Sequence, residues 1–225
     1  MSRPSEEPAY SSAAHSFERL AREIAEIGRG FYARGWALGT SGNYSAVLSA
    51  EPLRLAITSS GIDKGLIEPS QVIGVDEAGR IVEGTGKPSA ETLLHLTIVR
   101  QRGAGAVLHT HSIWSTLLSD FYSASGGLPI QGYEMLKGLE GVSSHEHSEW
   151  IPIIENSQDM EMLAAKVENG LRHHPAAHAF MLRGHGLYTW GRTLPEARRH
   201  IEIIEFLLEL VGRGREVSSK TLPTA

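Results

Sequence analysis

The chain contains no cysteine among its 225 residues. Disulfide bonds and thiolate ligands are therefore excluded, and any bound metal ion must be held by histidine, carboxylate or water. The sequence also has no run of 18 apolar residues, and its first twelve residues are polar and lack an apolar centre. It thus predicts neither a membrane span nor a secretory signal, and a cytoplasmic protein is expected.

Positive charge is scarce as well. The chain has 21 Lys and Arg residues against 26 Asp and Glu residues, a formal net charge of -5, and a pI near 6.1. This balance argues against a broad basic surface, so neither a nucleic acid nor a membrane is expected as a partner. A small anionic substrate stays open, because backbone N–H groups and a few local donors can bind a phosphate.

The apolar content is sufficient for a core. Hydrophobic residues make up 41% of the chain and charged residues 21%, which is typical of globular proteins. There is no internal repeat and no linker, so one domain over residues 1–225 is the simplest organisation. Segments 1–12 and 214–225 are rich in Ser, Pro, Glu and Thr, and we expect them to be mobile tails.

Hydrophobic periodicity predicts both helices and strands. Helical spacing occurs over residues 16–34, 89–102, 113–118, 159–171 and 195–211. Short apolar runs predict strands over residues 55–58, 72–75, 80–82, 106–109, 151–154, 179–182 and 187–190. Because the two types do not alternate strictly, the pattern favours an α/β fold of the α+β type, in which helices cover a central sheet.

One apolar run leads directly into two histidines, His109 and His111. Residues i and i+2 of a strand point to the same face, so both imidazoles could reach one point in space. A third histidine, His185, lies between two glycines far downstream. Three imidazoles with one open position are the usual arrangement of a catalytic zinc site. The alternative is a pair of strand histidines, one buried and one exposed.

Three turns are rich in hydrogen-bond donors. They are the segments 39–43, 58–61 and 86–89, which include Gly42, Asn43, Ser60, Gly61 and Ser89. Each alone has the composition of an ordinary turn. Together they could form a composite phosphate site, although none matches a Walker A or dinucleotide-binding pattern.

Two carboxylates are candidates for proton transfer near such a site. Glu91 lies in the first turn of a predicted helix, where it could simply complement the helix dipole. Glu134 lies in a mixed polar and apolar stretch and could be an ordinary surface residue. A second His-x-His pair, His145 and His147, has no apolar strand before it, and we interpret it as part of a solvated loop.

The order of these motifs resembles the class II aldolase and adducin head family over residues 16–212. The resemblance implies a three-layer fold in which helices cover both faces of a mostly antiparallel sheet. It implies zinc bound by His109, His111 and His185, and homotetramers with the active site near a subunit boundary. It also implies a sugar-phosphate substrate whose phosphate contacts Gly42, Asn43, Ser60, Gly61 and Ser89, with Glu91 as an acid/base group.

Within this family, segments 131–138, 151–156 and 185–191 resemble the dehydratase branch of methionine salvage. This resemblance implies a lyase that removes water from 5-methylthioribulose 1-phosphate, with Glu134 as the acid/base. The chain departs from the aldolases at Ala90, which replaces a serine of their phosphate site. Two alternatives remain: a sugar-phosphate aldolase, which the segment around Glu134 disfavours, and an adducin-like interaction module, which the three retained histidines disfavour.

Overall fold

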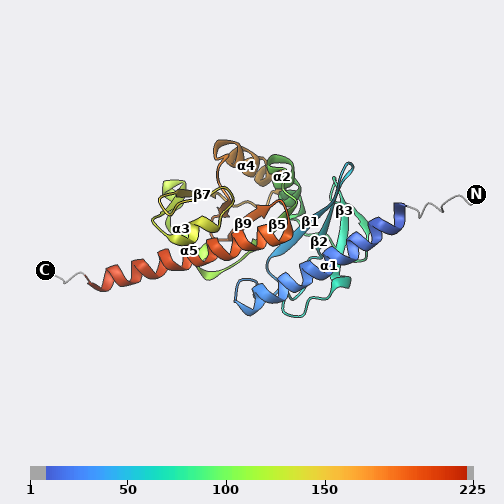
Figure 1. Ribbon diagram of the computed structural model, residues 1–225, viewed down its shortest axis with the longest axis horizontal. Coiled ribbons are helices and arrows are strands. Elements are labelled where there is room, and N and C mark those ends of the chain that lie inside the picture. The colour runs from blue at the N-terminus through green and yellow to red at the C-terminus, as the bar shows by residue number, and fades with distance from the viewer. Residues whose placement is uncertain (1–8, 222–225) are drawn as a thin grey trace, which may run out of the picture.

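In the part of the chain that the structure describes, nine strands form one sheet and five α-helices cover its two faces (Figure 1). The computed structural model describes residues 9–221, and the side chains of residues 16–215. The helices are α1 (Ala9–Ala33), α2 (Thr92–Arg102), α3 (Ile113–Phe121), α4 (Met160–His173) and α5 (Leu194–Thr221). The strands are β1 (Asn43–Ala50), β2 (Leu53–Thr58), β3 (Val72–Asp76), β4 (Ile81–Glu83), β5 (Ala106–Thr110), β6 (Gly127–Gln131), β7 (Ser148–Ile154), β8 (Ala179–Leu182) and β9 (Gly186–Gly191). Short 3-10 helices are η1 (Pro69–Gln71), η2 (Ser123–Ser125) and η3 (Glu134–Gly138).

The strand order is β4-β3-β2-β1-β5-β9-β8-β7-β6. Only β7 and β8 pair in parallel, whereas every other neighbouring pair of strands is antiparallel. The expected fold, a mostly antiparallel sheet between helical layers, is therefore confirmed.

Each face of the sheet has its own apolar core. Helices α2 and α4 bury side chains such as Leu94 and Val167 against one face. Helices α1, α3 and α5 cover the other face, where Phe31 and Ile204 are fully buried. Burial of one large apolar side chain contributes about 1.5–3 kcal/mol, so these two layers hold the strand ends in fixed positions.

The directions of the strands determine which strand ends lie together at each end of the sheet. Strands β5 and β8 run the same way because both are antiparallel to β9, and β7 is parallel to β8. Their carboxyl ends therefore lie together at one end of the sheet. Strand β6 is antiparallel to β7, so its carboxyl end, at Gln131, lies at the other end, opposite Ser148.

Two strands were missed by the sequence analysis. Strand β1 alternates Tyr44, Ala46 and Leu48 with Asn43, Ser45 and Val47, a period-2 pattern that the sequence analysis overlooked. Strand β6 contains Pro129 and begins at a glycine, and both residues are poor strand formers. Strand β6 forms because β7 pairs with it, a contact that local composition does not reveal.

The ends of the chain differ from the expected tails. Residues 9–12 belong to α1, and residues 214–221 continue α5. The remaining tail residues, 1–8 and 222–225, lie outside the described part. In addition, α2 begins at Thr92, three residues after the expected start.

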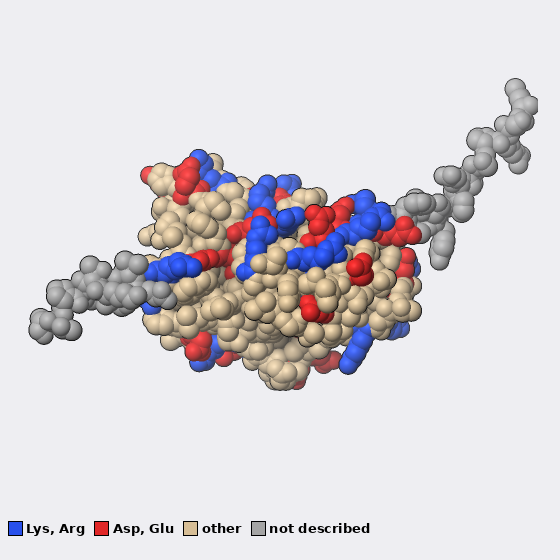
Figure 2. Space-filling view, turned by 90° about the horizontal axis from the view of Figure 1, so that it is seen from below, with Lys and Arg blue, Asp and Glu red and all other residues tan. Residues whose placement is uncertain are grey.

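Charge on the face displayed in Figure 2 is mixed. Lys and Arg atoms alternate with Asp and Glu atoms along one band, beside a wide uncharged area. This face thus lacks the continuous basic surface that a nucleic acid requires. Within residues 9–221, no helix has both the length and the apolar character needed to cross a bilayer.

Candidate metal and phosphate site

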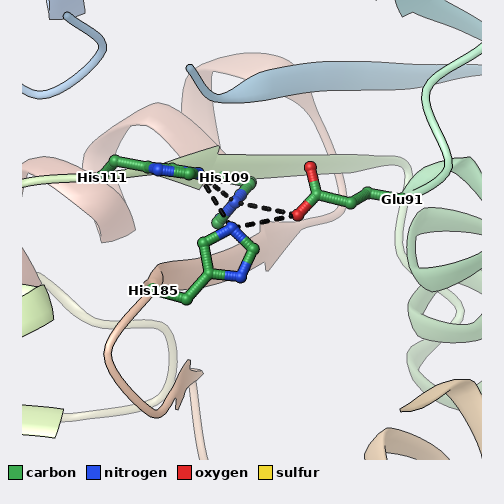
Figure 3. A group of neighbouring side chains, drawn as sticks. All are labelled: Glu91, His109, His111 and His185. Carbon is green, nitrogen blue, oxygen red and sulfur yellow. Dashed lines mark hydrogen bonds and ion pairs between the residues drawn. The ribbon is translucent and has the colours of Figure 1, made fainter. Parts of the chain in front are cut away.

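Four side chains converge at the end of the sheet where β5 finishes (Figure 3). His109 lies on β5, and His111 follows directly after it. His185 lies in the turn between β8 and β9, and Glu91 immediately precedes α2. One potential ligand atom from each residue lies within 4.8 Å of the other three. The predicted histidine set thus comes from two separate parts of the chain, and Glu91 joins it from a third.

The distances within this cluster suit a divalent metal ion. His111 Nε2 lies 2.8 Å from His109 Nε2 and 3.1 Å from His185 Nε2. Glu91 Oε1 lies 3.5 Å from His109 Nε2 and 3.2 Å from His185 Nε2. Four ligands at about 2.0–2.1 Å from a tetrahedral zinc stand roughly 3.3 Å apart. The four atoms therefore already have nearly the spacing of a ligand set.

Hydrogen bonding fixes the orientation of one imidazole. His109 Nδ1 donates to the backbone oxygen of Leu187 at 2.9 Å. The lone pair of this ring must then be on Nε2, which faces the other ligands. The ring also stacks on Tyr188, with centroids 3.8 Å apart and planes inclined by 10°. His109 is thus held both in position and in the tautomer that can bind a metal.

The charge states favour a cation at the centre. Burial, followed by the proximity of His109 and His185, lowers the pKa of His111 to about 3, so this imidazole is neutral at pH 7. Burial raises the pKa of Glu91, but the charges and hydrogen bonds of His109 and His185 outweigh it and lower this pKa below its usual range. A neutral imidazole and an ionised carboxylate are the forms that bind metals.

A chain of buried polar groups holds the carboxylate of Glu91 through hydrogen bonds. Asn43 Nδ2 donates to Glu91 Oε2 at 2.5 Å, and Asn43 Oδ1 accepts from His95 Nε2. Ser45 Oγ donates to His95 Nδ1 at 2.7 Å, and Tyr188 Oη donates to Glu91 Oε1 at 3.1 Å. Of His95 and Tyr188, the first is expected from the sequence to be a core or supporting group one turn after Glu91, whereas the supporting role of the second was missed. Glu91 and His95 are four residues apart on one helical face, which was an available signal for the first.

Beside the cluster lies a cavity of about 220 Å³. All five residues expected to contact phosphate line this cavity, together with Glu91 and His111. The second and third donor-rich turns are tied together, because Ser60 N donates to the backbone oxygen of Lys87 at 2.8 Å. The remaining lining residues are Thr40, Ser41, Thr58, Ser59 and Lys64.

Two of the five residues also have structural roles. Gly42 has a φ of +74°, and a Cβ there would lie 2.8 Å from the backbone oxygen of His109. Glycine is therefore required for the close approach of this turn to β5. The side-chain amide of Asn43 is already engaged by His95 and Glu91. The other three, Ser60, Gly61 and Ser89, line the same cavity.

Glu134 is not brought to this cavity within one chain. It begins η3, which follows the carboxyl end of β6 and therefore lies toward the opposite end of the sheet from His109. Its side chain is 73% exposed and pairs with Lys137 at 2.7 Å. His145 Nδ1 lies 3.9 Å from Glu134 Oε2.

The second His-x-His pair is only partly solvated. His145 is exposed as expected, but His147 Nε2 lies 2.8 Å from Glu149 Oε2, and Glu149 is buried. His178 contacts the same carboxylate at 3.0 Å. His147 therefore lies in a loop as expected but is only partly exposed, because it pairs with Glu149, the second residue of β7, whose start local composition did not indicate.

Comparison with known proteins agrees with this architecture. The family described as "Class II Aldolase and Adducin N-terminal domain" matches residues 22–211. Methylthioribulose-1-phosphate dehydratase of Pseudomonas savastanoi pv. phaseolicola is 45% identical over 206 residues, which cover 91% of this chain and all of the relative. The dehydratase of the same name from Methylococcus capsulatus is 46% identical over 198 residues, covering 88% of this chain and 95% of the relative.

A solved structure shares the fold. L-fuculose-1-phosphate aldolase from Thermus thermophilus superposes with a TM-score of 0.72 at 25% identity, covering 90% of this chain and 98% of that one. The sequence match spans most of the chain and includes all four residues of the convergent cluster. The chain therefore belongs to the class II aldolase and adducin family.

Proposed function

We propose that this protein is a metal-dependent lyase that converts 5-methylthioribulose 1-phosphate to 2,3-diketo-5-methylthiopentyl 1-phosphate and water. One observation carries the proposal: a cluster of three histidines and a glutamate shares Glu91 and His111 with a cavity lined by phosphate-type donors. Relatives named as dehydratases of this substrate match nearly the whole chain at 45–46% identity, which supports the choice within the family.

His109, His111 and His185 would hold the metal ion, with Glu91 beside it. Zinc fits this set because the donors are imidazole nitrogen and carboxylate oxygen at tetrahedral spacing. A bound zinc ion would act as a Lewis acid toward the oxygens on C2 and C3 of the substrate.

The turns that line the cavity would hold the substrate by its phosphate. Ser60 and Ser89 offer hydroxyl groups, and Gly61 allows close approach of the backbone. A phosphate on C1 fixed there would put C2 and C3 beside the histidine cluster, because His111 lines the same cavity. This arrangement orients the substrate before any bond changes.

The reaction needs proton transfer at two carbons. A base removes the proton from C3, the C4–O bond breaks, and an acid protonates the departing hydroxyl, which leaves as water. The resulting enol then takes up a proton at C4 and loses the proton of its C3 hydroxyl, which gives the 2,3-diketone. Glu91 is the carboxylate of the same chain that reaches this centre, because its Oε1 faces the histidines while Asn43 and Tyr188 hold it. It is suited to carry one of these protons.

Glu134 is proposed as the second acid/base group, supplied by a neighbouring subunit of a homotetramer. Its position toward the far end of the sheet rules out direct contact with the cluster of its own chain. Its exposure leaves the carboxylate free to enter another copy's cavity. Helix α3 also presents exposed Ile113, Leu117 and Phe121 at helical spacing, an apolar stripe suited to subunit contact.

Product identification tests this function directly. The zinc-loaded protein is incubated separately with 5-methylthioribulose 1-phosphate and L-fuculose 1-phosphate, and the products are identified by mass spectrometry and NMR. A dehydratase removes one water molecule from the first substrate and leaves the second intact. Cleavage of either sugar into two carbonyl fragments would instead identify an aldolase.

A further inference from the structure

A buried lysine lies between two of the turns that line the cavity. Lys64 is 1% exposed, yet it is one of the residues lining the cavity. Its Nζ donates to the backbone oxygen of Ile62 at 2.9 Å and approaches that of Thr40 at 3.4 Å. Ile62 follows Gly61, and Thr40 belongs to the turn that contains Gly42. The ammonium group therefore lies beside both glycine turns.

This ammonium group forms no ion pair within the described residues, 9–221. Its two polar contacts are backbone oxygens, and a protonated lysine has three donors. Asp63 is adjacent in sequence, but its Oδ1 accepts from the backbone of Gly65. Buried charges in proteins are normally paired, because an unpaired one has lost its hydration without compensation. Within the described residues, the ammonium group of Lys64 therefore lacks an anion to pair with.

The charge of Lys64 influences the pKa of a group in the histidine and glutamate cluster. Lys64 contributes to the lowered pKa of His111, and Glu91 opposes the shift in Lys64 itself. Burial lowers the pKa of Lys64 to about 8, so the group is still mainly protonated at pH 7. Its burial and its place in the cavity lining put the ammonium beside the cavity rather than in bulk solvent.

We propose that Lys64 supplies the positive charge that binds the phosphate group of the substrate. This inference rests on the proposed function, because it assigns the phosphate to the cavity next to the metal cluster. Neutral hydroxyl and backbone donors orient a phosphate but do not neutralise it, and Glu91 adds a negative charge to the same cavity. One lysine offsets part of this negative charge without a basic surface patch, which agrees with a chain of net charge -5.

The test compares Lys64→Met, Lys64→Arg and Lys64→Gln with Lys87→Met. Lys87 is exposed, does not line the cavity, and lies two residues before Ser89. It therefore serves as a control with the same change of charge. Binding of inorganic phosphate to the zinc-loaded proteins is measured by calorimetry, and KM and kcat are measured with 5-methylthioribulose 1-phosphate.

Loss of a charged hydrogen bond should weaken phosphate binding and raise KM about tenfold to hundredfold in Lys64→Met, with a smaller change in kcat. Lys64→Arg should retain much of the binding, and Lys87→Met should match the wild type. Without phosphate, Lys64→Met should unfold at a temperature equal to or above that of the wild type, because an unpaired buried charge is gone. If Lys64→Met does not fold, Lys64→Gln serves in its place.

A purely structural lysine gives a different result. The thermal midpoint would then fall in Lys64→Met, while phosphate affinity and KM stayed within about twofold of the wild type, and this would overturn the proposal. The two arms also separate this inference from the proposed function. Phosphate binding that depends on Lys64, without turnover of the methylthio sugar, would support Lys64 and refute the dehydratase assignment. Normal turnover with an unchanged KM in Lys64→Met would support the dehydratase assignment and refute the role of Lys64.

Discussion

The side-chain amide of Asn43 donates a 2.5 Å hydrogen bond to Glu91 Oε2, while Asn43 Oδ1 accepts from His95. This bond orients the other carboxylate oxygen toward the three histidines. We expect Asn43→Ala to lower kcat about tenfold to hundredfold, because a hydrogen bond to a charged group is lost. Ser45→Ala, which touches only the far side of His95, should have a smaller effect. Equal kcat values in steady-state assays of the two variants would contradict this positioning role.

Ser89 tests the location of the phosphate. Ser89→Asp would put a negative charge in the cavity, and we expect KM to rise at least about tenfold from like-charge repulsion. Ser70→Asp is the matched control, because Ser70 is exposed on η1 and does not line the cavity. A KM for Ser89→Asp equal to that of the control would contradict the placement of the phosphate beside Ser89.

The separation between Glu91 and Glu134 allows a complementation experiment. If each site takes Glu91 from one subunit and Glu134 from another, neither Glu91→Gln nor Glu134→Gln should be active alone. We expect each to lose about 10²–10⁴-fold in kcat, which is typical of an acid/base group. After dissociation and joint reassembly at equal amounts, about one quarter of the sites should have both carboxylates.

Activity in the mixed sample is the readout, with each variant reassembled alone as its control. Recovery well above the sum of the two variants would support a site shared between subunits. Failure to recover, in a sample whose mixed oligomers are verified by native mass spectrometry, would contradict it.

Glu205 predicts a pH dependence of stability. This carboxyl is buried on α5, where Thr110 Oγ1 donates to it at 2.5 Å, and burial raises its pKa from 4.5 to about 7. Because the folded-state pKa is raised, its stabilising contribution is complete below about pH 4.5 and is lost as the pH rises through 7. Glu205→Gln removes this loss. Its free energy of unfolding, relative to that of the wild type, should therefore be about 2–3 kcal/mol higher at pH 8 than at pH 5.

Urea unfolding of the metal-free proteins at both pH values measures this difference. Glu202→Gln is the control, because Glu202 lies on the same helix but is partly exposed and pairs with Arg198. A pH-independent difference between wild type and Glu205→Gln would show that the buried carboxyl does not titrate as described.

Some parts of the site could be predicted from local sequence. The two-residue spacing of His109 and His111 is a local property, and the apolar residues of β5 that precede His109 clearly indicate a strand. Addition of His185 relied on the Gly-His-Gly segment and the family resemblance, since nothing local says that β8 and β9 lie beside β5.

Other parts depend on contacts between distant segments. Asn43 was assigned to phosphate, but its amide is occupied by Glu91 and His95, which are 48 and 52 residues away. Glu134 was expected near the metal, but its position follows from the antiparallel pairing of β6, a strand that the sequence did not indicate. Lys64 carries no local pattern, and only its burial within the cavity marks it.

The central claim is that three histidines bind one catalytic metal ion. The most direct measurement is a titration of the metal-free protein with zinc, in which elemental analysis and dehydratase activity are followed in the same samples. We predict that activity rises in proportion to bound zinc and saturates at about one ion per chain, while His111→Ala retains little zinc and little activity. Full zinc retention in a His109→Ala/His111→Ala protein, or full activity without bound metal, would contradict the account.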